Sequence, residues 1–248
     1  MSERTLAGPG PAADGVLGGR VAVVSGGSRG IGRAVAASLV RSGASVLLVA
    51  RDRAATEQAA RELGAHAFAA DVSVESQVAE LAGAVQDRFG FADVVVHAAG
   101  AFQLAPIAET SVASFDRLWA VNLRGAFLLV SAFLPAMLAR GSGHLVSIGS
   151  LAGRTAMPGN GAYAASKFGL RGLHAVLDTE LQGTGVRASL IEPAATDTRL
   201  WDGIDPAAQS GVPGRAAMLR PEAVADAVLF AVTRPPGAVV RNIILDRN

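Results

Sequence analysis

The chain has 248 residues, of which 50% are hydrophobic and 17% are charged, so it can bury a large core. Its formal net charge is +1 and its basic residues are dispersed along the chain, which argues against a nucleic-acid partner. The absence of cysteine excludes a disulfide framework, thiol catalysis and cysteine-ligated zinc, and we expect no metal site because the histidines are scattered.

The first residues of the chain are rich in glycine, proline and alanine and lack the order of a secretory signal. We predict a flexible lead-in over residues 1–18 and a single domain over residues 19–248. The longest uncharged stretches fall short of the roughly 20 apolar residues that a membrane span needs. These features predict a soluble, cytoplasmic protein with no membrane partner.

Short, apolar, Val-rich runs alternate with stretches of helical spacing along the chain. We expect Ser73 to cap the third helix and Pro221 to open the last one. Strands that alternate with helices indicate βαβ units, and so an α/β fold with a Rossmann-type, doubly wound parallel sheet of about seven strands and helices on both faces. In chain order the predicted elements are strand 20–25, helix 31–41, strand 45–50, helix 54–63, strand 65–70, helix 73–89, strand 92–97, helix 111–140, strand 143–148, helix 162–183, strand 186–191, helix 221–233 and strand 239–245.

Glycines gather where the first predicted strand meets the first helix, in the pattern Gly26-x-x-x-Gly30-x-Gly32. Glycine permits a tight turn and lets a pyrophosphate approach the backbone, while the helix N-terminus offers free N–H groups to that anion. Ser28 and Arg29 can add a hydroxyl and a guanidinium. The pattern therefore favours a dinucleotide site, and a glycine-rich tight turn without a ligand is the alternative.

The end of the second predicted strand indicates which dinucleotide fits. A dinucleotide site usually carries a carboxylate about 20 residues after the glycine turn, bonded to the ribose 2′-hydroxyl. Here Arg51 occupies that place, and Asp52 follows it in the loop. Because a guanidinium binds a 2′-phosphate and a carboxylate repels one, we expect NADP(H). NAD(H) is the alternative if Arg51 is simply a solvated loop residue.

A candidate catalytic pair lies in the second half, where Tyr163, the only tyrosine of the chain, precedes Lys167 by four residues. On a helix these side chains share a face, and a nearby ammonium favours the phenolate, lowering the tyrosine pKa toward that of a usable general acid and base. Ser150 follows a predicted strand and can place a hydroxyl beside the phenol. The alternative is an ordinary half-buried tyrosine with a surface lysine.

Taken together and in this order, the motifs resemble those of the short-chain dehydrogenase/reductase family. The departures are Ser25 for threonine, His97 for asparagine and Ala194 for glycine, and we expect His97 to be a structural substitute rather than a catalytic base. The matched motifs cover most of the chain: SGGSRGIG at 25–32 for T-G-x-x-x-G-x-G, Asp71 and Val72 for the adenine-contacting pair, HAAG at 97–100 for N-A-A-G, Asn122 for the helix asparagine, Ser150 for the catalytic serine, Tyr163 and Lys167 for Y-x-x-x-K, and Pro193, Ala194 and Thr198 for P-G-x-x-x-T.

The resemblance implies a role for each matched residue. Tyr163 would exchange a proton with the substrate oxygen, Ser150 would hydrogen-bond that oxygen, and Lys167 would hold the nicotinamide ribose and tune Tyr163. Asn122 would perturb its helix and hold a water in a proton relay to Lys167, and Asp71 would accept from the adenine amino group. The resulting cofactor-binding set is Gly26, Ser28, Arg29, Gly30, Ile31, Gly32, Arg51, Asp71, Val72, Ala98, Ala99, Gly100, Tyr163, Lys167, Pro193, Ala195 and Thr198.

Residues 199–219 hold several glycines and prolines, and we expect them to form a lid over the substrate. The expected pocket walls are Arg154, Met157, Asn160 and Trp201, together with Ser150, and simple packing is the alternative for Trp201. The C-terminus lacks the G-G ending of relatives that act on acyl-carrier-protein thioesters. These residues leave the natural substrate, the reaction direction and the stereochemistry open.

The resemblance implies an NADP(H)-dependent carbonyl reductase or alcohol dehydrogenase, which interconverts a ketone and a secondary alcohol by hydride transfer. It also implies a homotetramer or dimer, and the apolar stretch AFLLVSAFLPAML at 126–138 fits such an interface. One alternative is a non-catalytic NADP(H)-binding sensor, against which the retained catalytic set argues. Another is an epimerase or dehydratase, which needs a larger substrate domain than about 50 residues after Thr198 allow.

Overall fold

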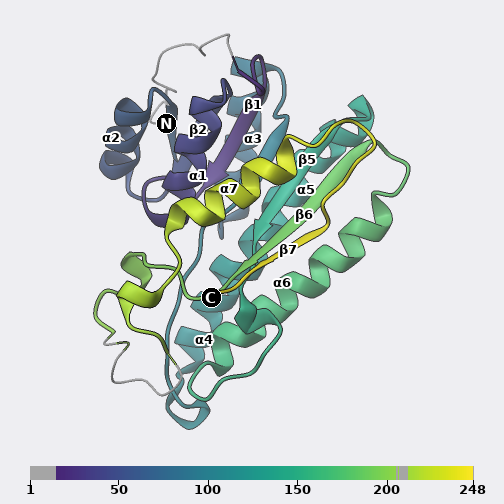
Figure 1. Cartoon of the computed structure of the whole chain (residues 1–248). Coiled ribbons are helices and arrows are strands. Elements are labelled where there is room, and N and C mark those ends of the chain that lie inside the picture. Colours follow the sequence, from purple (N-terminus) through teal and green to yellow (C-terminus); the bar gives the residue numbers. More distant parts are fainter. Residues whose placement is uncertain (1–14, 205, 207–211, 248) are drawn as a thin grey trace.

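The computed structural model describes residues 15–204, 206 and 212–247, which form alternating strands and helices (Figure 1). Residues 1–14 of the predicted lead-in, and residues 205 and 207–211 of the predicted lid, lie outside this range. Leu17 is buried and its N–H donates to the Ser42 carbonyl oxygen at 2.8 Å, so the packed part of the chain includes the end of the predicted lead-in. The elements are β1 (Val21–Ser25), α1 (Gly30–Arg41), β2 (Ser45–Ala50), α2 (Arg53–Leu63), β3 (His66–Ala69), α3 (Glu75–Phe89), β4 (Val94–His97), α4 (Val112–Trp119), α5 (Gly125–Arg140), β5 (Gly143–Ile148), α6 (Gly161–Glu180), β6 (Val186–Pro193), α7 (Pro221–Val232) and β7 (Asn242–Leu245).

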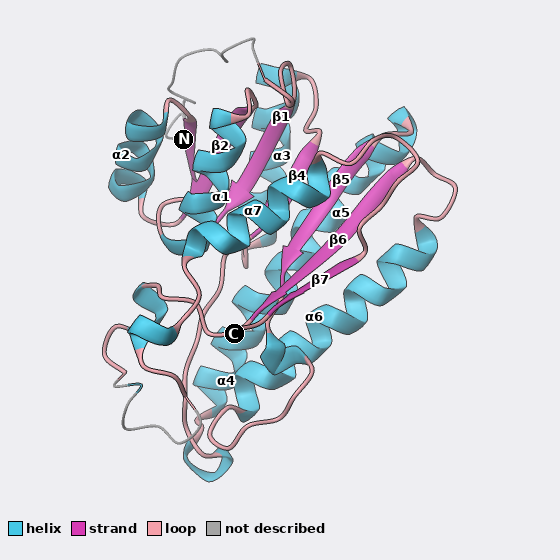
Figure 2. Ribbon diagram, viewed as in Figure 1, coloured by secondary structure: helices cyan, strands magenta, loops and turns pink. Residues whose placement is uncertain are grey.

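The strands form one sheet of seven, in the order β3-β2-β1-β4-β5-β6-β7, and every neighbouring pair is parallel (Figure 2). The predicted Rossmann-type, doubly wound sheet with helices on both faces is therefore confirmed. All five residues of β1 are buried, which is typical of a parallel strand covered by helices on both faces.

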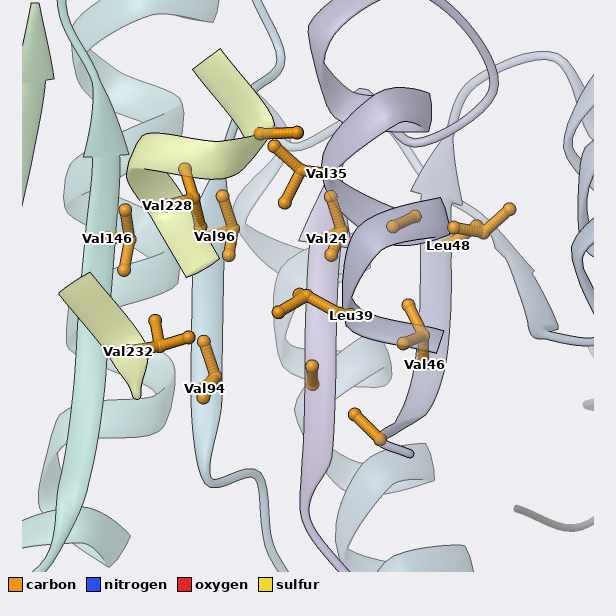
Figure 3. Close-up of a cluster of buried hydrophobic side chains, with 14 of the residues drawn as sticks. Val24, Val35, Leu39, Val46, Leu48, Val94, Val96, Val146, Val228 and Val232 are labelled. Atoms are coloured by element: carbon orange, nitrogen blue, oxygen red, sulfur yellow. The ribbon is translucent and has the colours of Figure 1, made fainter. Parts of the chain in front are cut away.

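The sheet separates two layers of helices. Val24 of β1 faces the layer that contains α1, α2 and α7. In this layer Val35 and Leu39 of α1 pack beside β1 and β2, while Val228 of α7 packs over β4 and β5 (Figure 3). Val23 belongs to the second cluster, with side chains from α3, α5 and α6. Because successive side chains of a strand alternate between its faces and helices cover both faces, β1 and β2 are apolar along almost their whole length, whereas β5 and β6 also carry buried polar residues.

The predicted helix 111–140 is one helical path with an interruption in its middle. Ser111 is the N-cap of α4 and accepts from the Ser114 N–H at 3.1 Å, and a π-helical turn, Ala120–Arg124, joins α4 to α5. Over Val112–Arg140 this path is long and apolar enough to cross a bilayer. Its buried side chains, Phe133 and Met137 among them, pack into the second core cluster, so we assign this helix to the core.

Several predicted boundaries are wrong: β4 begins at Val94 rather than at residue 92, and α6 ends at Glu180 rather than at residue 183. Ser73 does not cap α3, because the N-cap is Val74 and the Ser73 hydroxyl donates to Asp71 Oδ1 at 2.7 Å instead. The last strand begins at Asn242 rather than at residue 239. Before this strand, the Val240 carbonyl accepts from the Ser189 hydroxyl, and the Arg241 carbonyl accepts from the Leu190 N–H at 2.9 Å.

The buried histidines predict that acid destabilises the fold. Burial is the main cause that lowers the pKa of His97 and of His144 to about 3, from an ordinary value of about 6.5. The unfolded chain then binds more protons below about pH 6.5, so stability falls as the pH falls toward 3. Moving from about pH 7 to about pH 5 should lower the free energy of unfolding by about 2 kcal/mol for each histidine.

Urea unfolding at the two pH values measures this effect. The variant His144→Asn should lose about 2 kcal/mol of the pH-dependent change, whatever its stability at neutral pH, because it has one titrating histidine fewer. An unchanged pH dependence in this variant would contradict the prediction.

Candidate active site

The residues assigned to the cofactor and to catalysis lie in segments that follow the strands. Because the strands are parallel, these segments all leave from the C-terminal edge of the sheet. β1 and β4 are neighbours, but the chain continues from β1 to β2 on one side and from β4 to β5 on the other. Such a reversal of strand order creates the crevice in which doubly wound folds bind ligands.

The glycine turn after β1 is packed too closely for side chains. Gly26 has a φ of +68°, and a Cβ at this residue would lie 2.8 Å from backbone atoms of Ala98 and Ala99, after β4. A Cβ on Gly32 would lie 2.2 Å from the Gly26 carbonyl oxygen. The glycines therefore allow the turn after β1 to lie against the segment after β4 and the start of α1 to lie against that turn, and they leave backbone that a phosphate group can approach.

The N-terminus of α1 lies at the same point. Arg29 is its N-cap and, among the described residues, its side chain makes no capping bond to the first turn, so the N–H groups of that turn are available to an anion. Ser28 is half-buried beside this turn and Ile31 is half-buried within it. Thr198, from the segment after β6, packs here, since a Cβ on Gly30 would lie 3.3 Å from its methyl carbon. The structure thus brings the first and last predicted motifs together.

A cavity of about 370 Å³ lies at the ends of β2 and β3. It contains the predicted Arg51 and Asp71, and Arg51 Nη1 lies 3.9 Å from Asp71 Oδ2. Sequence analysis missed Arg53 and Gln77, although Arg53 is a second arginine only two residues after Arg51. The cavity therefore presents two guanidinium groups beside one carboxylate. Its lining consists of Arg51, Arg53, Ala69, Ala70, Asp71 and Gln77.

The remaining predicted cofactor residues border the crevice. Val72 is buried, and a Cβ on Gly125 would lie 3.0 Å from one of its methyl carbons, so Val72 is held against the start of α5. Gly100 is exposed after β4, and Pro193 is buried at the end of β6. The Ala195 carbonyl accepts from the Leu219 N–H at 2.9 Å, which joins the segment after β6 to the residues just before α7.

Lys167 lies on the first half of α6, and its ammonium group is buried. Its Nζ donates to the Ile148 carbonyl oxygen at 2.9 Å, at the end of β5, and lies 5.7 Å from the centre of the Tyr163 ring. Burial lowers the pKa of Lys167 to about 8. The two side chains therefore share one helix face, as the spacing predicted.

The electrostatics of Tyr163 differ from the prediction. Burial raises the pKa of Tyr163 to about 12, and a hydrogen bond with the Ser150 side chain acts in the opposite direction. The predicted lowering of this pKa by the Lys167 ammonium is wrong for this structure, because desolvation of the phenolate outweighs the other effects. Ser150 Oγ also accepts from the Ala152 N–H at 3.1 Å, which orients its hydroxyl at the end of β5.

Asn122 lies in the π-helical turn Ala120–Arg124, so the helix departs from α geometry at the residue for which a perturbation was predicted. Its Oδ1 accepts from the Ala101 N–H at 2.8 Å, and its Nδ2 donates to the Ala101 carbonyl and the Ser166 hydroxyl at 2.9 Å each. The side chain thereby joins the segment after β4 to α6. These three bonds use both amide hydrogens of Asn122, and its predicted water relay stays a prediction.

His97 occupies the position of the expected asparagine and is buried. Its Nδ1 lies 3.2 Å from Ser25 Oγ, which also accepts from the N–H groups of Ala98 and Ala99. Because that hydroxyl accepts twice, its own hydrogen is directed to His97 Nδ1. Burial, with a smaller effect of the Lys167 charge, lowers the pKa of His97 to about 3, so the ring is neutral. These contacts match the predicted structural role.

An aromatic cluster lies on one side of Tyr163. The Phe102 ring meets the Tyr163 ring edge to face at 4.8 Å between centroids, and the Trp201 ring lies 4.8 Å from Phe102. Trp201 is buried and its Nε1 donates to the Thr196 carbonyl at 3.1 Å, so it packs into the fold and reaches Tyr163 only through Phe102. Phe102 was not among the predicted site residues, although it lies only two residues after the motif at 97–100.

The other predicted pocket residues lie between Ser150 and α6. Met157 is exposed on the loop, whereas Asn160 is buried as the N-cap of α6. The Asn160 side chain makes no capping bond and its Oδ1 is buried without a hydrogen-bond partner in the described part of the chain, and Met157 is the more accessible of the two.

Comparisons with known proteins agree with this geometry. A family model described as short chain dehydrogenase matches residues 20–209. D-threitol dehydrogenase from Mycolicibacterium smegmatis is 39% identical over 196 residues, which are 75% of this chain and 75% of that protein. Glycine betaine reductase ATRR from Emericella nidulans is 36% identical over 245 residues, which are 95% of this chain but 19% of that much longer protein.

Among solved structures, a metagenomic short-chain oxidoreductase in complex with NADP superposes with a TM-score of 0.81 and 35% sequence identity. The match covers 94% of this chain and 99% of that chain. With the family model matching most of the chain and the motif residues gathered at one edge of the sheet, this protein is an oxidoreductase of the short-chain dehydrogenase/reductase family.

Proposed function

We propose that this protein is an NADP(H)-dependent oxidoreductase that interconverts a ketone or other carbonyl compound and a secondary alcohol, with Tyr163 as the general acid and base. The observation that carries the proposal is the arrangement of three side chains at the end of β5. The Tyr163 phenol hydrogen-bonds with Ser150, and the buried Lys167 ammonium lies on the same helix face. A positioned proton donor beside a cation is what carbonyl reduction requires.

The chain fits a dinucleotide with a 2′-phosphate. The glycine turn leaves backbone free of side chains at Gly26 and Gly32, and the first turn of α1 offers its N–H groups to a pyrophosphate. Arg51 and Arg53 line the cavity at the ends of β2 and β3, where a 2′-phosphate would pair with guanidinium groups. When bound, the nicotinamide ring supplies or accepts the hydride. The NADP found in the similar metagenomic enzyme supports the same preference here.

The phenol of Tyr163 suits the donor role in reduction. A phenol whose pKa is about 12 holds its proton at neutral pH and can donate it to a carbonyl oxygen that is gaining charge. The Ser150 hydroxyl can hydrogen-bond the same oxygen, and the Lys167 ammonium stabilises the phenolate that Tyr163 becomes. In the direction of alcohol oxidation the same groups act in reverse, and Tyr163 accepts the proton.

The surroundings of Tyr163 support an apolar substrate of modest size. The Phe102 ring packs against the phenol ring of Tyr163, and the Trp201 ring packs against Phe102. Met157, on the loop before α6, is exposed. We keep residues 199–219 as the proposed lid and residues 19–248 as the proposed dinucleotide-binding catalytic domain.

Assembly and location remain predictions. Large apolar side chains are exposed on α4, α5 and α6, including Val112, Phe127, Phe168 and Val176. Their exposure supports the predicted homotetramer or dimer, because contiguous apolar patches on soluble proteins mark contact surfaces. The predicted cytoplasmic location follows from sequence composition alone.

The variant Tyr163→Phe should lower kcat for ketone reduction by at least about 100-fold, because a positioned general acid contributes about 10² to 10⁴ in rate. Its affinity for NADPH should stay near that of the wild type, since the aromatic ring and its packing against Phe102 are kept. The measurement is NADPH absorbance against a panel of ketones, with NADPH fluorescence as the binding control. Undiminished turnover by the variant would refute the role of Tyr163 as general acid. A wild-type protein that binds NADPH tightly but reduces no ketone would favour the alternative of a non-catalytic NADP(H)-binding sensor.

The variant Arg51→Ala should lower kcat/KM with NADPH by about 10- to 100-fold, because a hydrogen bond to a charged group is worth about 1.5–3 kcal/mol. Activity with NADH should change little, since NADH carries no 2′-phosphate. Arg61→Ala is the matched control, because Arg61 is exposed on the neighbouring α2 and does not line the cavity in the described part of the chain. Equal losses with both cofactors in Arg51→Ala would overturn the assignment of Arg51 to the phosphate.

A further inference from the structure

Glu192 is a buried carboxylate at the end of β6, with 1% of its surface exposed. A charge in the interior costs several kcal/mol unless it is paired and hydrogen-bonded. Replacing a whole buried ion pair with apolar side chains often leaves stability unchanged, whereas removing one partner alone is strongly destabilising, so a buried pair calls for a reason besides stability. The partners of Glu192 indicate that reason.

The carboxylate belongs to a closed ring of three side chains. Glu192 Oε2 accepts from Arg154 Nε at 2.7 Å and from Asn242 Nδ2 at 2.6 Å, and Arg154 Nη2 forms an ion pair with the same oxygen at 2.6 Å. Arg154 Nη2 also donates to Asn242 Oδ1 at 2.8 Å, which closes the ring. Because each of the three side chains is bonded to the other two, Arg154 is held in one orientation.

This ring holds the segment that carries Ser150. Arg154 follows the short 3-10 turn Leu151–Gly153 directly, and its own N–H donates to the Leu151 carbonyl at 2.8 Å. On the other side of Ser150, a Cβ on Gly149 would lie 3.0 Å from Glu192 Cγ. The side-chain carbons of Glu192 therefore lie against Gly149, just before Ser150. Its carboxylate binds Arg154, just after the turn that follows Ser150.

The same carboxylate also lies near α6, which carries Tyr163 and Lys167, and Glu192 is the last but one residue of β6. Arg171 Nε lies 3.9 Å from Glu192 Oε1, and Arg171 is one helical turn beyond Lys167 on α6. Along the chain, Glu192 immediately precedes Pro193, where the segment assigned to the nicotinamide end begins. One buried carboxylate thus contacts the Ser150 segment and the Tyr163 helix, and it lies on the strand that leads to the proposed cofactor segment.

We propose that Glu192 and Arg154 are positioning residues that set the Ser150 hydroxyl against the Tyr163 phenol. This inference rests on the proposed function. Neither residue donates a proton or contacts the reacting atoms; they act through the backbone on both sides of Ser150. Loss of the pair moves Ser150, weakens its bond to Tyr163 and slows the proton transfer, while the glycine turn and the Arg51 cavity keep their affinity for NADPH.

The test uses the full-length enzyme with NADPH and an active ketone. Glu192→Gln, which removes the charge at constant size, and Arg154→Lys, which keeps the charge but loses the fork, should each lower kcat by about 10- to 100-fold, the loss that a small misplacement of reacting groups causes. The KM for NADPH should stay unchanged. The double variant should lose no more than the worse single variant, because both act through one contact.

A spectroscopic readout separates positioning from general loosening. Tyr163 is the only tyrosine, so ¹³C-tyrosine labelling yields a single Cζ resonance that reports its hydrogen bond with Ser150. Glu192→Gln and Arg154→Lys should shift this resonance in the direction seen in Ser150→Ala. The matched control is Asp178→Asn, which removes a carboxylate that pairs with Arg241 at 2.8 Å, also between α6 and the residues before β7. It should leave both the resonance and kcat unchanged.

Three results would overturn the proposal: a wild-type resonance and kcat in Glu192→Gln, equal effects in Asp178→Asn, or a loss of NADPH affinity as large as the loss of kcat. If Glu192→Gln does not fold, Arg154→Lys decides in its place. A wild-type enzyme that turns over no carbonyl would refute the proposed function, and the resonance comparison would still decide whether the pair positions Ser150.

Discussion

Lys167 brings an ammonium group into the interior at the C-terminal edge of the sheet, and the rest of the candidate site is arranged around it. A buried ammonium needs partners, and the Ile148 carbonyl accepts from its Nζ at 2.9 Å. This bond ties α6 to the end of β5 and fixes which face of α6 is turned toward the sheet. Tyr163, one helical turn earlier, therefore faces Ser150, which follows β5.

Other buried polar bonds join segments in the same way. Ser25 links β1 to His97 at the end of β4, and Asn122 links the segment after β4 to α6. The π-helical turn around Asn122 allows its side chain to make these bonds while α4 and α5 continue on either side. A buried polar group that loses its partner costs free energy. Each of these bonds therefore favours the observed arrangement of the crevice over arrangements in which the bond is broken.

The two ends of the crevice differ in their exposure to water, and this difference suits different tasks. The Arg51 side chain is 70% exposed, so it can attract an anion from solution while its pairing with Asp71 remains weak. Tyr163 packs against Phe102, and the buried Lys167 Nζ lies 5.7 Å from the centre of its ring. Desolvation there raises the pKa of the phenol. The proposed charge recognition and the proposed proton transfer are thus assigned to separate environments that the strand order places along one edge.

The amino-acid sequence by itself determined the order of strands and helices, the parallel sheet, the glycine turn and the identities of Ser150, Tyr163 and Lys167. These features depend on local periodicity and on spacing within one helix or turn, which are properties of neighbouring residues. Only the tertiary structure decided that Ser73 bonds Asp71 instead of capping α3, that Phe102 covers Tyr163, that the phenol pKa rises and that Glu192 meets Arg154. Most of these depend on contacts between distant segments and on exclusion of water, and no local pattern encodes either.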